Sequence, residues 1–303
     1  MAPVVVTDST GMIPAAVRDR FHVPSVPLRV VFGDESYRDG VDIHPDEFYR
    51  KLAAFKGTAG TTQPSPGDFV AVFQPIAQEG RDIVCVTISS RLSGTYNSAL
   101  QAAELVEDMF DGVRIAVVDS RMASAGHGLL ALKAAERAAE GASVDEILAA
   151  LDRLRLRIVL LAVVDTLEYL IRGGRVGRAR GLVGKILGLH PLLTLVDGEV
   201  DSPGVVRSRR AGLQRIEEET ERRLTGEGRR RMVVIHADAE DEAREWAERI
   251  RDRFRPDDLW IEPFTPVLGV HTGPGLLGLV SCEDPEAGAG GSPGADGGKG
   301  EPS

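Results

Sequence analysis

The chain has 303 residues, which is enough for one large domain or two ordinary ones. Its formal net charge of −10 gives it no general attraction for nucleic acid, so we expect no nucleic-acid partner. It has two cysteines, no visible signal peptide and no apolar run near the ~20 residues of a membrane span, so we expect a cytoplasmic protein without a disulfide framework.

The first half of the chain alternates short apolar runs with stretches of helical periodicity. The apolar runs predict strands at residues 4–6, 28–32, 83–88 and 115–118. The spacing of apolar residues predicts helices at 96–110, at 128–139 and from the capping box of Ser143 and Glu146 through Leu154. Strands and helices that alternate in this way predict an α/β fold with a parallel sheet.

The second half of the chain is less regular. It predicts a strand at 158–164, a hairpin with a turn at Asp197-Gly198, helices at 211–224 and 241–253, and strands at 232–235 and 260–268. We therefore expect an N-terminal α/β domain at 1–155 and a smaller α+β domain at 156–282. Residues 283–303 contain seven glycines, three prolines and no large apolar side chain, which predicts a disordered tail.

Polar side chains follow three of the predicted strands, at 7–10, 89–95 and 119–120. The carboxyl ends of parallel strands meet at one edge of a sheet, which is where open α/β sheets bind their ligands. These hydroxyls and carboxylates therefore predict a polar pocket at that edge. The alternative is that they are helix N-caps, which favour the same residue types.

The segment Ser93-Gly94-Thr95 directly precedes a predicted helix. Backbone N–H groups and the positive end of the helix dipole would then point toward whatever Ser93 contacts, which favours an anion. The sequence contains no Gly-x-Ser-x-Gly elbow, so Ser93 lacks that hydrolase signature.

A second helix start follows Thr61 and Thr62. Ser65 and Asp68 resemble a capping box, and the intervening proline suits the first helical position. The two threonine hydroxyls then lie in the loop before this helix. We expect Pro75 to kink the helix or end it early.

Motifs for nucleotides and metals do not match. Gly184-Lys185 resembles the end of a phosphate loop, but Ala179 stands where the first glycine belongs and Ile186 follows the lysine. The glycines at 173–177 do not form the dinucleotide pattern, and the six histidines show no metal-ligand spacing, so we predict no cofactor and no metal.

Two further features remain open between a structural and a functional interpretation. His271 lies in a glycine- and proline-rich loop at 269–275, where it is either a turn residue or a donor to an anion. A dense group of basic residues is either a solvated loop or a docking surface for a nucleotide or an acidic partner; it consists of Arg172, Arg175, Arg178, Arg180 and Lys185.

Taken together, these segments resemble the DegV family of bacterial fatty-acid-binding proteins from Val4 to Val280. The motifs that carry the resemblance occur in order along the chain and are Val6–Thr10, Thr61–Pro66, Ile88–Tyr96, Leu167–Val176 and Gly269–Gly275. The resemblance implies two α/β domains with one long-chain fatty acid in the cleft between them.

The resemblance also implies which residues hold the carboxylate. It assigns this role to Thr61, Ser93 and His271. Thr62 stands where serine is usual in the family, so it is a second candidate threonine. In the segment Val206-Arg207-Ser208-Arg209 the resemblance implies one arginine near the site, and we choose Arg207 over Arg209. As further pocket-lining residues we predict Gly94, Thr95, Ser120 and Thr272.

The function implied by the resemblance is that of a lipid-binding subunit and not of an enzyme. A separate ATP-dependent fatty-acid kinase phosphorylates the carboxylate that the binding protein presents, and the acyl phosphate enters phospholipid synthesis. Transient membrane contact is compatible with this role. Two alternatives stay open, namely a hydrolase with Ser93 as nucleophile and His271 as base, and a lipid-sensing regulator.

Overall fold

The computed structural model describes residues 1–182 and 188–287. Its first sheet is parallel throughout, with the strand order β2-β1-β6-β7. These strands are β1 (Val4–Asp8), β2 (Ser25–Val26), β6 (Ile83–Thr87) and β7 (Ile115–Asp119). The predicted α/β fold with a parallel sheet is therefore confirmed.

A second sheet has six strands in the order β10-β9-β8-β13-β11-β12. It is antiparallel except for the neighbours β11 and β12. These strands are β8 (Val159–Val163), β9 (His190–Val196), β10 (Glu199–Val206), β11 (Arg229–His236), β12 (Asp258–Pro263) and β13 (Leu277–Asp284). The predicted hairpin is confirmed, because Asp197 (φ 52°) and Gly198 (φ 82°) both adopt the left-handed backbone that a two-residue turn between β9 and β10 requires.

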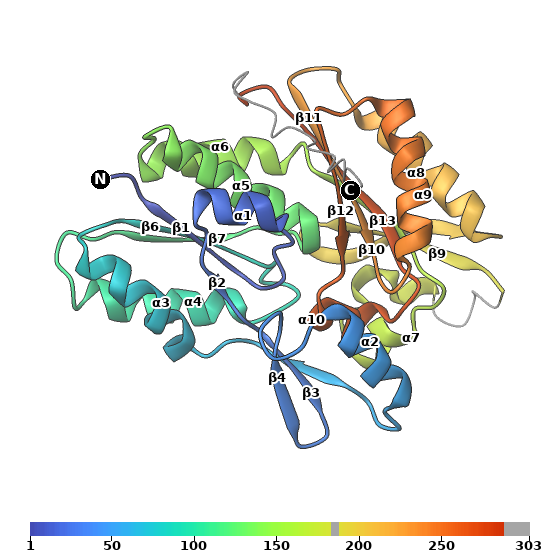
Figure 1. Cartoon of the computed structure of the whole chain (residues 1–303), viewed down its shortest axis with the longest axis horizontal. Helices are drawn as coiled ribbons and strands as arrows, with labels where there is room; N and C mark the ends of the chain where they lie inside the picture. Colours follow the sequence, from blue (N-terminus) through green and yellow to red (C-terminus); the bar gives the residue numbers. More distant parts are fainter. Residues whose placement is uncertain (183–187, 288–303) are drawn as a thin grey trace, which may run out of the picture.

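A third, antiparallel sheet has the order β4-β3-β5 and projects from the lower edge of the molecule in Figure 1. Its strands are β3 (Arg29–Phe32), β4 (Glu35–Arg38) and β5 (Gly60–Thr62). Among the shorter helices, α1 (Ala15–Phe21) packs against α5 (Ser124–Ala139). The others are α2 (Pro45–Ala54), α7 (Glu168–Arg172), the 3₁₀ helix η1 (Gly177–Leu182) and α10 (Pro266–Thr272).

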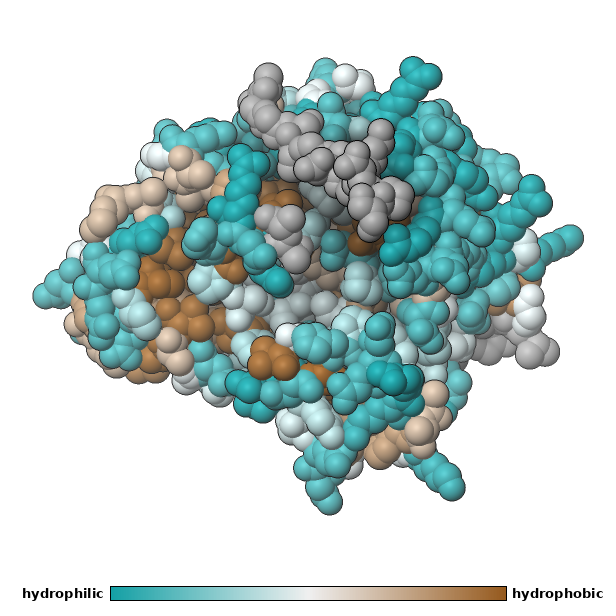
Figure 2. All heavy atoms as spheres, viewed as in Figure 1, coloured by the Kyte–Doolittle hydropathy of each residue, from teal (hydrophilic) through white to brown (hydrophobic). Residues whose placement is uncertain are grey.

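The longer helices and the two large sheets form alternating layers (Figure 1). The outer face of the four-stranded sheet is covered by α3 (Pro66–Gln78) and α4 (Thr95–Glu107). The middle layer is α5 (Ser124–Ala139) with α6 (Val144–Arg155), and both helices also contact β13 of the six-stranded sheet. The far face of that sheet is covered by α8 (Arg209–Arg223) and α9 (Glu240–Phe254), whose outward surface is hydrophilic in Figure 2.

Strand residues alternate between these layers, as the two-residue period of a strand requires. In β6, Ile83 and Cys85 pack toward α3 and α4, while Val84 and Val86 pack into the middle layer. Both faces of the strand are buried, which explains why its sequence is a continuous apolar run.

Local signals in the sequence predict several helix ends correctly. Ser65 with Asp68 and Ser143 with Glu146 both form complete capping boxes at the starts of α3 and α6. Of the two effects expected of Pro75, an early end of α3 is wrong, because the helix continues to Gln78 with the proline inside it, and a kink stays a prediction.

Two predictions for the C-terminal part need correction. The predicted strand at 260–268 ends at Pro263, and Pro266 begins α10 at the helical position where its missing N–H costs nothing. The predicted tail from 283 is wrong at its first residues, because β13 includes Glu283 and Asp284. Both carboxylates are buried next to basic groups, with Arg230 Nη2 2.8 Å from Glu283 Oε1 and Lys133 Nζ 2.8 Å from Asp284 Oδ2. Residues 288–303 of the predicted tail lie outside the described residues.

The predicted division at 155/156 falls between α6 and β8 and stays a prediction. Among the described residues, no helix combines the length and the apolar character needed to cross a membrane.

Candidate functional site

A cavity of about 420 Å³ lies where β5, the loop after β6, α7 and α10 meet the inner face of the six-stranded sheet. This volume falls within the ~300–1,000 Å³ of typical small-molecule sites. The cavity has a polar end and an aliphatic part, and each is built from different elements.

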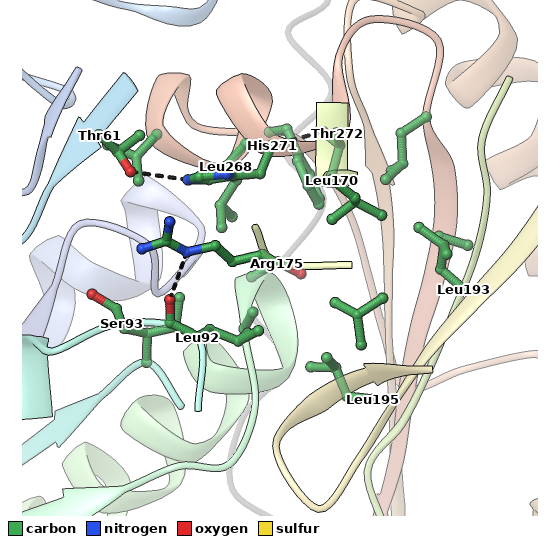
Figure 3. A pocket seen from close by; sticks show the side chains of 18 of the residues that line it. Thr61, Leu92, Ser93, Leu170, Arg175, Leu193, Leu195, Leu268, His271 and Thr272 are labelled. Carbon is green, nitrogen blue, oxygen red and sulfur yellow. Dashed lines mark hydrogen bonds between the residues drawn. The ribbon is translucent and has the colours of Figure 1, made fainter. Parts of the chain in front are cut away.

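The aliphatic part is formed largely by strands of the six-stranded sheet. Leu160 and Ala162 of β8 and Leu193 and Leu195 of β9 are two residues apart on their strands, so each pair shares one face. Figure 3 shows Leu193 and Leu195 on the opposite side of the cavity from Thr61 and Ser93. Further apolar side chains come from other elements, including Leu28, Ile88, Leu170, Ile235, Phe264 and Leu268.

The polar end brings together residues that are far apart in the sequence. Thr61 on β5 lies opposite His271 on α10, and its Oγ1 is 2.9 Å from Nε2 of the imidazole. β5 holds its threonine in register through pairing with Val30 of β3. Thr61 and His271 are separated by 210 positions, so only the packing of α10 against the β3–β5 sheet makes this contact.

His271 is neutral at physiological pH. Burial, together with the nearby positive charge of Arg175, lowers the pKa of the imidazole to about 4. Its Nδ1 is buried and has no hydrogen-bond partner among the residues that the structure describes. A proton on Nδ1 would be a buried donor without an acceptor, which costs about 1–3 kcal/mol. The proton therefore belongs on Nε2, which donates to Thr61 Oγ1 and leaves the threonine hydroxyl proton free for a ligand.

Ser93 approaches the cavity from the loop that precedes α4. Its Oγ lies 2.9 Å from Thr95 Oγ1 and accepts a 3.3 Å hydrogen bond from the Thr95 backbone N–H. The helix begins at Thr95, so the predicted placement of Ser93 at a helix N-terminus is confirmed.

Arg175 is the cationic side chain among the described residues that line the cavity. Its Nε donates to the carbonyl of Leu92 at 3.2 Å, and its Nη1 donates to the carbonyl of Gly173 at 2.6 Å. In Figure 3 its guanidinium lies between Ser93 and the Thr61–His271 pair. These hydroxyls and this one positive charge can bind a carboxylate, because charged hydrogen bonds satisfy an anion away from bulk water.

The structure places five of the predicted site residues in the cavity wall, and they are Thr61, Thr62, Ser93, His271 and Thr272. The other four do not line it. A Cβ on Gly94 would fall 2.2 Å from Gln63 Oε1, so this glycine faces that side chain instead. Thr95 is fully buried against Ser93, and Ser120 Oγ donates to the backbone of Met122 at 3.1 Å.

Arg207 is exposed at the end of β10 and does not line the cavity. The rejected alternative, Arg209, does not line it either, because its guanidinium is paired with Glu242 at 2.7 Å and also contacts the Gly275 carbonyl. The arginine that lines the cavity is therefore Arg175, from a different segment than the one predicted. Its sequence signal is the motif Leu167–Val176, whose basic residues left a solvated loop and a docking surface as the open alternatives. Lys185 of that loop lies outside the described residues.

The prediction of one polar pocket at three strand ends is only partly met. Asp8 at the end of β1 turns inward, where its carboxylate accepts hydrogen bonds from the Thr10 backbone at 2.9 Å and from the Ile88 backbone at 2.7 Å. This carboxylate therefore has the structural role that was the alternative interpretation. Within 1–182 and 188–287, no group of three or more His, Cys, Asp or Glu side chains is arranged to hold a metal ion.

Comparisons with known proteins agree with this architecture. Residues 3–284 match the family model described as an uncharacterised protein of the DegV family. A DegV domain-containing protein from Streptomyces coelicolor is 37% identical over 278 residues, covering 91% of this chain and 96% of that protein.

Solved structures also match over almost the whole chain. A DegV family protein from Thermus thermophilus, whose structure is described as fatty acid binding, has a TM-score of 0.86 and 34% identity and covers 93% of this chain and 100% of its own. DegV from Bacillus subtilis, described as a fatty acid binding protein, has a TM-score of 0.85 and 30% identity, with coverage of 93% and 99%. A stearic acid-binding protein from Eubacterium ventriosum has a TM-score of 0.84 and 27% identity, with coverage of 94% and 99%.

The family model spans nearly all of the described residues and the relatives match at full length, so the chain belongs to the DegV family.

Proposed function

We propose that this chain binds a long-chain fatty acid in the 420 Å³ cavity. The observation that carries the proposal is the division of the cavity into one end with hydroxyls and a guanidinium and a remainder lined by aliphatic side chains. The carboxylate would lie between Thr61, Ser93 and Arg175, and the acyl chain would extend toward Leu193 and Leu195. The names of the relatives from Thermus thermophilus and Bacillus subtilis support this ligand class.

The two parts of the cavity contribute differently to binding. An acyl chain of 16 carbons has ~14 methylenes, and each contributes roughly 0.8 kcal/mol when it is buried. The gross gain, on the order of 10 kcal/mol, is enough for tight binding after the cost of association. The polar end therefore mainly orients the ligand, since a carboxylate without partners would be costly inside the protein.

The proposal is tested by native mass spectrometry of the protein purified from cells, followed by extraction and identification of the bound lipid. We expect one fatty acid per chain, removed by delipidation and restored on adding hexadecanoate. A delipidated protein that binds neither hexadecanoate nor the extracted lipid would refute fatty-acid binding.

We further propose that the protein presents the carboxylate to a separate ATP-dependent fatty-acid kinase. In this step a carboxylate oxygen attacks the γ-phosphorus of ATP, the bond to the bridging oxygen breaks, and acyl phosphate and ADP form. The segment that resembles a phosphate loop departs from the motif at Ala179 and Ile186, which favours a separate ATP-binding partner. The cytoplasmic location and transient membrane contact are part of this proposal.

Reconstitution tests the kinase step. Loaded protein, ATP and a purified fatty-acid kinase should give acyl phosphate that hydroxylamine traps as the hydroxamate. If the loaded protein gives no more product than free fatty acid does, the presenting role is wrong, and a lipid-sensing regulator becomes the better proposal.

The hydrolase alternative is disfavoured by the geometry. A serine nucleophile needs a base within hydrogen-bond reach, about 2.6–3.2 Å. Ser93 Oγ contacts Thr95, whereas the Nε2 of His271 contacts Thr61. We therefore expect a fluorophosphonate probe to leave Ser93 unlabelled, and labelling of Ser93 would revive the alternative.

A further inference from the structure

Gly173 occupies a position where the backbone itself does not require glycine. It follows the last residue of α7, and its φ of −74° lies in the ordinary right-handed region. The space beside it is nevertheless closed to a side chain. A Cβ at this position would fall 2.2 Å from Nδ1 and 2.9 Å from Cε1 of His271.

The carbonyl of the same residue contacts the second group at the polar end of the cavity. It accepts the 2.6 Å hydrogen bond from Nη1 of Arg175. One residue therefore contacts both the imidazole and the guanidinium, its Cα facing the first and its oxygen binding the second.

The backbone of α10, which carries His271, is held against its neighbours from two sides. On the α7 side, a Cβ on Gly273 would fall 2.3 Å from the ring of Tyr169. The contact is reciprocal, because the Tyr169 ring of α7 lies against the glycine that follows α10, and the His271 ring of α10 lies against the glycine that follows α7. On the α2 side, a Cβ on Gly269 would fall 2.5 Å from the ring of Phe48. The backbone of α10 thus cannot retreat from residue 173, and a clash there has to be relieved by the His271 ring.

We propose that Gly173 is a positioning residue for the ligand carboxylate. Its bare Cα closes off Nδ1 of His271, keeps the imidazole proton on Nε2 and directs that proton to Thr61, while its carbonyl aims Arg175 at the anion. The inference rests on the proposed fatty-acid site, which it deepens by explaining what orients the groups at the polar end.

A methyl group at residue 173 would force the imidazole to tilt, which would break the 2.9 Å contact between Nε2 and Thr61 Oγ1. We expect Gly173→Ala to weaken hexadecanoate binding about tenfold, the loss of one hydrogen bond in a charged network. The affinity of the same variant for hexadecanol, which lacks the charge, should fall by less than about threefold. The control is Gly181→Ala, because a Cβ there meets no heavy atom of the described residues within 4 Å and its backbone is not left-handed.

Nitrogen NMR of the histidine side chains gives a readout that a purely structural role would not change. In the native protein, His271 should show the Nε2–H tautomer, and Gly173→Ala should alter that pattern while Gly181→Ala leaves it intact. If both variants leave the tautomer and the affinity unchanged, the proposal is overturned.

A double-mutant cycle with His271→Ala separates positioning from a general packing defect. Removing the imidazole creates room for the new methyl group. In the His271→Ala background, Gly173→Ala should therefore lower the affinity for hexadecanoate by less than about twofold. If the single variant does not fold, the double variant should still fold as stably as His271→Ala alone. An equal cost of Gly173→Ala with and without the imidazole, or a double variant that also fails to fold, would overturn the proposal.

The tautomer measurement and the stability arm of the cycle need no ligand. A protein that binds no fatty acid but still couples residues 173 and 271 would refute the proposed function and leave the positioning contact intact. A protein that binds fatty acid but does not couple residues 173 and 271 would support the proposed function and refute the positioning role of Gly173.

Discussion

Replacing Thr61 with valine is the sharpest test of the polar end of the cavity. Valine keeps the shape of threonine and removes the hydroxyl that lies 2.9 Å from His271 Nε2. The variant loses one hydrogen bond to the carboxylate and leaves the imidazole N–H without its acceptor. A hydrogen bond to a charged group is worth about 1.5–3 kcal/mol, so the Kd for a fatty acid should rise roughly 10- to 150-fold.

The measurement is calorimetric titration of delipidated protein with hexadecanoate and, separately, with hexadecanol. The alcohol buries the same methylenes, so its affinity should change much less than that of the acid. Thr62→Val is the matched control, since Thr62 lines the same cavity from the next position of β5, is exposed and has no hydrogen bond to His271. Equal losses for acid and alcohol, or an unchanged affinity for the acid, would show that Thr61 does not hold the carboxylate. A loss at Thr62 as large as that at Thr61 would instead make Thr62 a second ligand of the carboxylate.

Four other predictions follow from particular contacts. Ser93→Ala should weaken hexadecanoate binding by about 1.5–3 kcal/mol and leave hexadecanol almost unaffected, and unchanged acid affinity in titration would contradict its role. Burial lowers the pKa of His271 to about 4, so its NMR signals should not titrate between pH 8 and 5, and the stability that depends on the neutral ring should be lost as the pH falls from 6.5 toward 4. Burial raises the pKa of Asp39 from 3.8 to about 7, so its contribution to stability is present below pH 3.8 and is lost as the pH rises through 7. Asp39→Asn keeps an acceptor for Ser9 and should therefore stabilise the protein at pH 8 by at most roughly 4 kcal/mol while changing little at pH 4, and parallel urea curves at both pH values would refute this. Asp284→Ala leaves the Lys133 ammonium buried without its partner and should cost about 3–5 kcal/mol in urea unfolding, whereas a loss under about 1 kcal/mol would place residue 284 outside the fold.

The parts of the fold that were predicted correctly depend on short-range patterns. The apolar run at 83–88 became β6, and the capping box of Ser143 and Glu146 begins α6. The Asp197-Gly198 turn closes the β9–β10 hairpin. Each of these signals is a hydrogen bond, a backbone preference or a side-chain alternation within a few residues, so a linear sequence displays it.

The failures have a common cause in longer-range contacts. The apolar residues at 264–268 are compatible with a strand or a helix, and α10 exists where they pack against α2 and α7. Glu283 and Asp284 appear suited to a solvated tail until Arg230 and Lys133 are brought beside them. The sequence does not distinguish Gly173 from an ordinary loop glycine, and only the fold places the His271 ring against it.

By itself, the sequence determined the parallel α/β sheet, the starts of the longer helices α3, α4, α6, α8 and α9 to within two residues, and the family to which the chain belongs, because these depend on local patterns and on motifs in a fixed order. Only the tertiary structure decided that Arg175 and not Arg207 lines the cavity, and that Thr61 meets His271 across 210 positions. The physical reason is that such contacts are made when separate elements pack together, and neither the spacing nor the type of the residues along the chain encodes the distance between them.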